Sequence, residues 1–451
     1  MSLPSHTLAH WRAELETGRT TSRALTELAL DAAHRSSEGR TTYLVLHDEA
    51  ALATADAIDR QRAAGVPLPP LAGLPLSIKD LFDEAGQVTR AGSRVLDGAA
   101  PATADSVIVR RLRAAGAVIV GRTNMTEFAF SGLGLNPHHG TPRNPWMRET
   151  GHIPGGSSSG AAISVTDGMA AAAIGTDTGG SVRIPSALCG LVGFKPTARR
   201  VSIEGVLPLS PSLDSIGPLA HSVACCALLD AVLAGQSPAP LMPARLAGRR
   251  FAVPRTLVFD GVDVQVATAF ERARERLVAA GAVMVDLEVP EFAELAHINR
   301  YGGFTSSEAW AWHEPLLNTR QAEYDARVAS RMRRGEAMTA AQYIALQADR
   351  RRWIAAVSAR LDDVDAVLMP TVPVIAPTIA ELTESEPAYT AANQLILRNP
   401  TLINFLDGCA LSLPCHRPGE APVGLMVAGL GGQDDKLLRV GAAIEAVLAA
   451  S

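Results

Sequence analysis

The stretch VIVRRLRAAGAVIVGRTN, residues 107–124, indicates the fold class of this chain. Its first half has the spacing of an amphipathic helix, which ends at Gly116, and the apolar AVIV that follows is typical of a buried strand. The same pattern recurs as ERARERLVAAGAVMV at 271–285, with Gly281 in the equivalent position. Two helix–glycine–strand units favour an α/β fold, in which crossover helices join the strands of a sheet.

The rest of the chain extends this pattern in both directions. Residues 7–64 have apolar positions three and four apart and are expected to be helical. LPLSI, within LAGLPLSIKDLF (71–82), is a candidate strand that ends at Lys79, and residues 305–360 are expected to form amphipathic helices. No Pro/Gly/Ser-rich linker divides the chain, so we expect one large domain over residues 1–451.

The composition excludes several classes of protein. Of the 451 residues, 47% are hydrophobic and 19% are charged, and the formal net charge is −5. No run of five or six like charges occurs, which argues against a nucleic-acid partner and against a polybasic membrane tether. No apolar run reaches the roughly 18 residues that a membrane span needs. We therefore expect no nucleic acid and no membrane among the partners.

The cysteines and the N-terminus point to a reducing compartment. The five cysteines form no CxxC pair, and an odd number in a long chain is not typical of a disulfide framework. The opening MSLPSHTLAHWRAELETG has no basic flank followed by an apolar segment, so it does not have the pattern of a secretory signal. The expected location is the cytoplasm.

The segment GGSSSGAA, residues 155–162, places three consecutive serines between glycines and suggests a catalytic loop. It fits GxSxG, the nucleophile elbow of α/β-hydrolases, with Ser158 at the centre. An elbow requires an apolar strand directly before it, whereas NPWMRETGHIP is polar and interrupted by prolines. Phosphate loops are also excluded, because neither GK nor GxGxxG occurs in the chain.

A lysine-based mechanism fits the residues better. A serine hydroxyl is a weak nucleophile until a base removes its proton, and a buried neutral lysine can serve as that base. Lys79 ends an apolar strand, Ser157 lies in the first glycine loop, and Ser181 lies in a second one, GTDTGGSVRIPSALCGLVGFKPT (175–197). Glycine–serine loops of this kind also present the backbone N–H donors of an oxyanion hole. From the residues alone, a salt-bridge role for Lys79 remains open.

Six motifs together resemble the amidase signature family. They are GLPLSIKD (73–80), GRTNMTEFA (121–129), NPHHGTPRNPW (136–146), GGSSSG (155–160), GTDTGGSVRIPSA (175–187) and PVGLMVAG (422–429). The resemblance runs from about residue 5 to 449. It is strongest over a signature core at 70–220, which follows an N-terminal helical segment at 5–65. It implies a single α/β domain with a central mixed sheet covered by helices on both faces.

The resemblance also implies roles for individual residues. Ser181 would be the nucleophile, Ser157 the proton relay, held by a cis peptide bond, and Lys79 the base. An oxyanion hole is expected from the backbone of Thr178, Gly179, Gly180 and Ser181. Ser158 is expected to support the site by a hydrogen bond to the base. Asp177 and Arg183 are expected to brace the second loop. Phe130 and Ser131 match the substrate-lining stretch of the family.

Other candidate residues are given less weight. His138, His139 and His152 have no Cys/Asp/Glu cluster at ligand spacing, so neither a metal nor another cofactor is expected. Four further side chains, Tyr301, Trp310, Trp312 and His313, could close a pocket, but core packing is the preferred interpretation.

Three hypotheses of function follow. The first is a stand-alone hydrolase that converts a small-molecule carboxamide to a carboxylate and ammonia or an amine. The second is the amidase component of a multi-subunit complex. That complex is either a glutamine-dependent tRNA amidotransferase, or a ureido or carboxybiuret amidase with an accessory subunit. The third is a non-catalytic interaction protein on the same fold. A homodimer that involves the N-terminal helices is compatible with the sequence.

Overall fold

Both helix–glycine–strand units are present in the computed structural model, which describes residues 2–450. Gly116 and Gly281 have φ values of +83° and +89°, in the region that residues with a Cβ rarely adopt. Glycine therefore ends each helix and turns the chain into the strand. The two units are α5 (Val107–Ala114) with β3 (Val118–Thr123), and α9 (Val264–Ala279) with β8 (Val283–Leu287).

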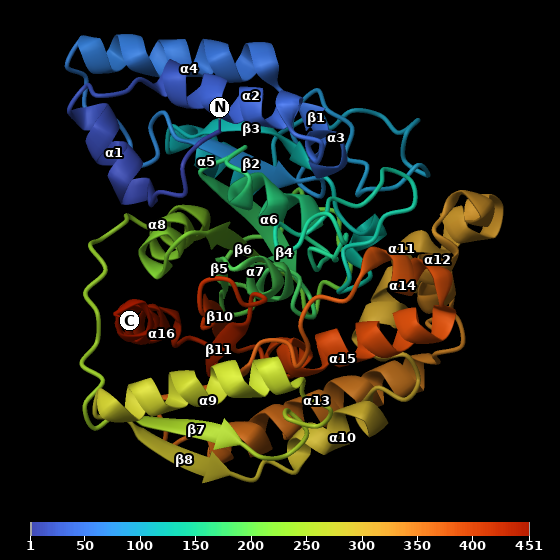
Figure 1. Cartoon of the computed structure of the whole chain (residues 1–451). Helices are drawn as coiled ribbons and strands as arrows, with labels where there is room; N and C mark the ends of the chain where they lie inside the picture. Colours follow the sequence, from blue (N-terminus) through green and yellow to red (C-terminus); the bar gives the residue numbers. More distant parts are fainter. Residues whose placement is uncertain (1, 451) are drawn as a thin grey trace.

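Eleven strands form one mixed sheet in the order β1-β3-β2-β4-β6-β5-β10-β11-β9-β7-β8, which runs from top to bottom of the molecule in Figure 1. The other strands are β1 (Tyr43–Leu46), β2 (Pro75–Lys79), β4 (Ala172–Asp177), β5 (Val192–Lys195), β6 (Ser215–Ala220), β7 (Arg250–Pro254), β9 (Ala366–Pro370), β10 (Cys409–Pro414) and β11 (Gly424–Gly429). Strand β2 is parallel to β3 and β4, β7 is parallel to β8 and β9, and the other pairs are antiparallel. The predicted α/β fold with a central mixed sheet is confirmed.

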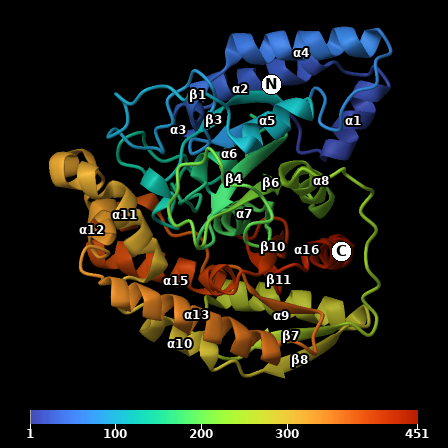
Figure 2. The same ribbon diagram turned by 180° about the vertical axis from the view of Figure 1, so that it is seen from behind.

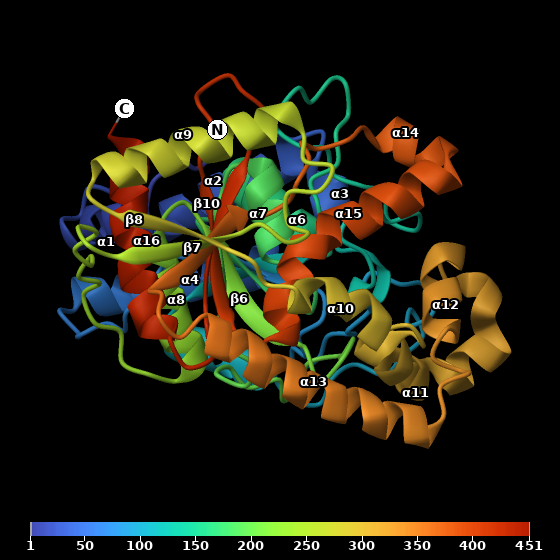
Figure 3. The same cartoon turned by 90° about the horizontal axis from the view of Figure 1, so that it is seen from below.

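Helices cover both faces of the sheet, as the view from below shows (Figure 3). Helices α8 and α16 pack on one face against β6 and β10, and α6 and α7 pack on the other against β4 and β5. The remaining helices are α1 (Leu8–Glu16), α2 (Ser22–Arg35), α3 (Gly39–Thr42), α4 (Asp48–Ala63), α6 (Ser159–Thr166), α7 (Arg183–Cys189), α8 (Val223–Ala234), α10 (Glu291–Ile298), α11 (Gly303–Arg320), α12 (Ala326–Arg333), α13 (Ala340–Arg360), α14 (Ile379–Glu384), α15 (Glu386–Phe405) and α16 (Asp434–Ala449).

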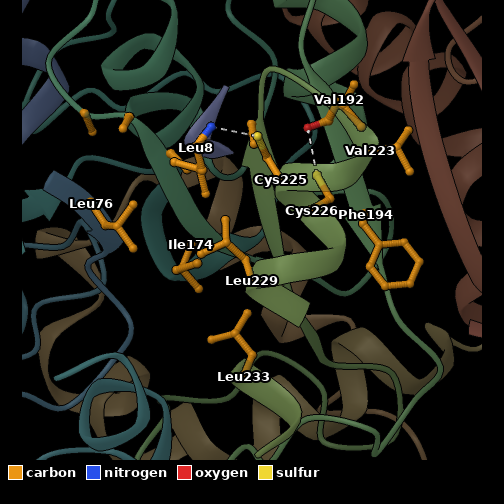
Figure 4. Close-up of a cluster of buried hydrophobic side chains, with 14 of the residues drawn as sticks. Leu8, Leu76, Ile174, Val192, Phe194, Val223, Cys225, Cys226, Leu229 and Leu233 are labelled. Atoms are coloured by element: carbon orange, nitrogen blue, oxygen red, sulfur yellow. Dashed lines mark hydrogen bonds between the residues drawn. The ribbon is translucent and has the colours of Figure 1, made fainter. Parts of the chain in front are cut away.

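The cysteines lie mostly within the hydrophobic core. Figure 4 shows Cys225 and Cys226 of α8 packed among apolar side chains of the sheet. Cys225 Sγ accepts a hydrogen bond from Leu8 N at 3.2 Å, and Cys226 Sγ donates to Val192 O at 3.6 Å. All five cysteines are free thiols. The two in α8 therefore act as small apolar side chains that fix the helix on the sheet.

Two predicted helical regions differ in detail from the structure. Residues 7–64 form four helices but also contain strand β1, which pairs antiparallel with β3. The sequence does not reveal this strand, because a four-residue apolar run fits helical spacing equally well. Residues 305–360 fall mainly in α11, α12 and α13; α11 and α12 pack side by side at the left in Figure 2, and α13 runs below them. Within residues 2–450, no helix is both long enough and apolar enough to span a membrane.

Candidate active site

Lys79 is the last residue of β2, and all five residues of that strand are buried. Its Nζ donates hydrogen bonds to Ser157 Oγ at 2.7 Å and to Thr176 Oγ1 at 2.8 Å. Burial lowers the pKa of Lys79 to about 7, although the charges of Asp177 and Asp214 act in the opposite direction. At neutral pH a large fraction of this amine is therefore uncharged, which is the form that accepts a proton.

The first glycine loop holds Ser157 beside this amine. Ser157 follows a cis peptide bond with Gly156, as the family resemblance implies, and its side chain is buried. A Cβ on Gly156 would lie 2.5 Å from Gly134 N, so only glycine allows the loop to approach this segment. Thr126 N donates to Ser157 O at 3.0 Å and fixes the serine backbone.

The expectation that Ser158 hydrogen-bonds the base is wrong. Its hydroxyl donates instead to the backbone carbonyl of Thr176 at 3.3 Å. The second partner of Lys79 is the Thr176 hydroxyl on β4, the strand next to β2. The sequence does not point to Thr176, because the residue is brought next to Lys79 only by the pairing of β2 with β4. Its one local signal is its position two residues before Thr178 in the second glycine loop.

Asp177 and Arg183 brace the second loop from inside. Arg183 Nε lies 3.0 Å from Asp177 Oδ2 and Arg183 Nη2 lies 2.9 Å from Oδ1, and both side chains are fully buried. Burial raises the pKa of Asp177, but the charge and hydrogen bonds of Arg183 outweigh it and hold the pKa well below its usual range. The same carboxylate accepts hydrogen bonds from Gly180 N at 2.8 Å and Val182 N at 3.1 Å. The ion pair therefore fixes the loop that carries Ser181.

One of the four expected oxyanion donors is already occupied. Gly180 N–H points back to Asp177 Oδ1, so it is not available to a ligand. For the N–H groups of Thr178, Gly179 and Ser181, no acceptor is found within residues 2–450. The loop thus offers three free backbone donors next to the Ser181 side chain.

Asp214 is a second, half-buried carboxylate that the sequence did not indicate. Thr178 Oγ1 donates to Asp214 Oδ1 at 2.5 Å, and Leu209 N and Ser210 N each donate to Oδ2 at 3.0 Å. Burial raises the pKa of Asp214 to about 7, against these hydrogen bonds. Asp214 therefore ties the side chain of Thr178 to the backbone of residues 209 and 210.

A cavity of about 240 Å³ opens beside Ser181. Phe130 and Ser131, the predicted substrate-lining residues, lie on its wall with Thr178 and Gly179. The volume is below the usual range of ligand pockets, which suits a small substrate. Its other lining residues are Ala129, Leu209, Leu213, Asn299, Gly302, Phe304, Thr305, Arg331, Asn393, Leu397, Thr401 and Phe405.

The four aromatic and histidine candidates do not reach this cavity. His313 is buried and its Nδ1 lies 2.9 Å from Tyr324 Oη, while Trp310 packs against an apolar cluster without lining the cavity itself. Tyr301 and Trp312 are exposed. Core packing is thus the correct interpretation for His313 and Trp310.

We expect Arg183→Leu to lower the free energy of unfolding by about 3–5 kcal/mol, because it leaves the buried Asp177 charge without its partner. The urea midpoint measures this loss. Arg12→Leu is the matched control, since it removes an arginine from an exposed pair with Glu16 and should cost less than about 1 kcal/mol. Equal midpoints for the two variants would show that the buried pair does not brace the loop.

Comparisons with known proteins show the family to which the chain belongs. The sequence model of the family described as "Amidase" matches residues 24–438. The chain is 37% identical to 2-amino-5-chloromuconic acid deaminase of Comamonas testosteroni, over 98% of this chain and 96% of the relative. It is 34% identical to one of the subunits of glutamyl-tRNA(Gln) amidotransferase of Streptomyces coelicolor, over 98% and 95%. A crystal structure described as an amidase matches with a TM-score of 0.88 at 35% identity, covering 98% of this chain and 99% of that one.

The sheet and the matched proteins together define a hydrolase with an α/β fold that acts on C–N bonds. Its family follows from the extent of the match: the chain belongs to the amidase family and hydrolyses amide bonds.

Proposed function

We propose that this amidase hydrolyses the carboxamide of a small molecule through an acyl-enzyme on Ser181. The observation that carries the proposal is the 2.7 Å hydrogen bond between Lys79 Nζ and Ser157 Oγ, made by a fully buried amine. The two glycine loops are in contact, because Ser158 N donates to Ser181 O at 3.4 Å. Ser181 also lines the cavity, where a substrate carbonyl can reach it.

The residues support the following proton route. Neutral Lys79 takes the proton of Ser157 Oγ while Ser157 takes that of Ser181, whose Oγ attacks the amide carbon. The N–H groups of Thr178, Gly179 and Ser181 donate to the oxyanion. The proton then returns through Ser157 to the leaving nitrogen, and the C–N bond breaks to leave an acyl ester and free ammonia or amine. Water attacks the ester, its proton follows the same route, and the carboxylate leaves.

We propose that the substrate is a free small molecule and that its amide is not part of a macromolecule. The cavity beside Ser181 measures about 240 Å³. The relative that is 37% identical acts, by its name, on 2-amino-5-chloromuconic acid, a small molecule. We infer a reducing compartment such as the cytoplasm, because all five cysteines are free thiols.

A catalytic component of a larger complex is the second candidate. It is favoured by the 34% identity to the amidotransferase chain of Streptomyces coelicolor over nearly the whole length. Against it, subunits of that kind resemble ASSNLARYDGIRYG in this region, whereas residues 306–320 here are SSEAWAWHEPLLNTR. This segment lies in α11, and none of its residues lines the cavity of Ser181. Copurification of a second chain with the protein from its own cells would favour this candidate.

The first test is ammonia and amine release by the purified chain on a panel of aliphatic, aromatic, amino-acid and ureido amides, with glutamine included. The result that we expect is turnover of one class by the wild type, with Ser181→Ala as the blank. Turnover of glutamine alone, dependent on an added partner chain, would favour the role in a complex. Equal release by wild type and Ser181→Ala would overturn the proposed function.

A further inference from the structure

One charged side chain lines the cavity of Ser181. Of the cavity residues within the described range 2–450, only Arg331 carries a charge, and the others are apolar or neutral polar. Arg331 lies in α12, about 150 residues after the nucleophile loop, so no motif of the sequence points to it. A single cation in a small cavity favours binding of a substrate that has a negatively charged group.

The charge of Arg331 has no carboxylate partner in the described part of the chain. No carboxylate within residues 2–450 lies within 4.0 Å of it, although arginines on the same helix are paired: Arg327 with Glu386 and Arg333 with Glu336. The hydrogen bonds of Arg331 go to neutral groups, the carbonyl of Phe130 and, at 2.5 Å, the hydroxyl of Tyr389. A guanidinium has five N–H donors, so donors remain free for a ligand. These two contacts hold the group in place and leave its charge uncompensated.

Asn393 of α15 supplies a second free donor to the same cavity. Its Oδ1 accepts hydrogen bonds from Ser131 Oγ at 2.9 Å and from Gly132 N at 3.0 Å. Because a backbone N–H can only donate, Gly132 fixes which end of the amide is the oxygen. The Nδ2 end has no acceptor within the described residues, and Asn393 lines the cavity while 8% exposed.

A hydrogen-bond network ties the two donors together. Tyr389 Oη accepts from Arg331 and donates to Ser131 Oγ at 3.1 Å, which in turn bonds Asn393. Three of these side chains, those of Arg331, Ser131 and Asn393, line the cavity, and Tyr389 is buried behind them. The donors are therefore held in fixed positions before a ligand arrives, which reduces the entropy lost on binding.

We propose that Arg331 and Asn393 form a carboxylate subsite, so that the enzyme acts on amides whose acyl part carries a second, ionised carboxylate. The inference rests on the proposed function, and it assigns the substrate class of the same site. A half-amide of a short dicarboxylic acid meets both requirements. Its amide reaches Ser181, and its carboxylate accepts from the guanidinium and the Nδ2 donors.

The kinetic test compares two amides of similar size, succinamate and butanamide, which differ mainly in the carboxylate. A hydrogen-bonded charge pair in a site of this kind corresponds to about a 10- to 100-fold preference, so we expect the wild type to favour succinamate by that ratio in kcat/KM. Arg331→Met should remove most of the preference, and Arg331→Lys should keep part of it. Arg334→Met, at an exposed arginine three residues on, should keep the whole preference.

A binding measurement separates this inference from the proposed function. Succinate alone should raise the melting temperature of the wild type and of Arg334→Met but not that of Arg331→Met. This readout needs no catalysis, so loss of amide turnover would count against the proposed function alone. An equal rise in Arg331→Met, or hydrolysis of butanamide as fast as succinamate by the wild type, would overturn the carboxylate subsite.

Discussion

Replacing Ser181 by alanine is expected to lower kcat by about 10⁵- to 10⁶-fold, the largest effect of any single change in this protein. The variant lacks the Ser181 hydroxyl, which lines the cavity next to three free N–H groups, whereas the Thr178 hydroxyl of the same loop is bonded to Asp214. The backbone N–H of residue 181 is retained, so substrate still binds and KM should change little. Intact-protein mass spectrometry after acid quench should detect an acyl adduct on the wild type and none on Ser181→Ala.

The three consecutive serines of the first loop provide matched controls for this result. Ser157→Ala breaks the hydrogen bond to Lys79 but keeps the nucleophile, so kcat should fall by about 10²- to 10⁴-fold with an adduct still formed slowly. Ser159→Ala removes a buried hydroxyl that has no hydrogen-bond partner in the described chain, and kcat should stay near the wild-type value. An acyl adduct on Ser181→Ala would show that another residue is the nucleophile.

The parts of the site that lie close together in sequence can be predicted from it. PLSIK is short and mostly apolar, which predicts Lys79 at the end of a buried strand, and the structure has that strand with all five residues buried. Gly116 and Gly281 are predicted to end helices because a positive φ at that point suits glycine, and both have one. Each of these signals depends on a few neighbouring residues, so it can be recognised without knowing the fold.

The parts that depend on long-range packing cannot be predicted in this way. Asn393 is 262 residues from Ser131, and Arg331 is 201 residues from Phe130, yet these pairs are hydrogen-bonded around one cavity. Only the packing of α12 against α11 and of α15 against α7 and β10 brings them there. The use of Gly180 N–H by an aspartate side chain is not predictable either, because the direction of a single N–H depends on the three-dimensional turn.

The pH dependence of kcat/KM should follow the deprotonation of Lys79. Because burial lowers the pKa of this amine to about 7, the neutral form dominates above that pH and is lost as the pH falls. We expect kcat/KM to level off above pH about 8 and to drop tenfold per unit below about 7, reaching roughly one hundredth of the plateau at pH 5. Lys79→Met should lower the plateau by about 10²- to 10⁴-fold and abolish this slope.

Two further pH effects have to be separated from the protonation of the base. Between pH about 7 and the ordinary lysine value, the unfolded chain binds more protons at Lys79 than the folded one, so stability falls with decreasing pH. Circular dichroism at each pH therefore accompanies the kinetics, and only points from fully folded protein are used.

Asp214, whose carboxylate lies beside the second glycine loop, is a second group to consider, since burial raises its pKa to about 7. The variant Asp214→Asn distinguishes the two groups. The charge of Asp214 raises the pKa of Lys79, so its removal should shift the midpoint of the profile to lower pH if Lys79 is the base. If ionisation of Asp214 controlled the rate, the same variant would instead lose the pH dependence. A wild-type profile that is flat between pH 5 and 8 would exclude both groups and, with them, a lysine base.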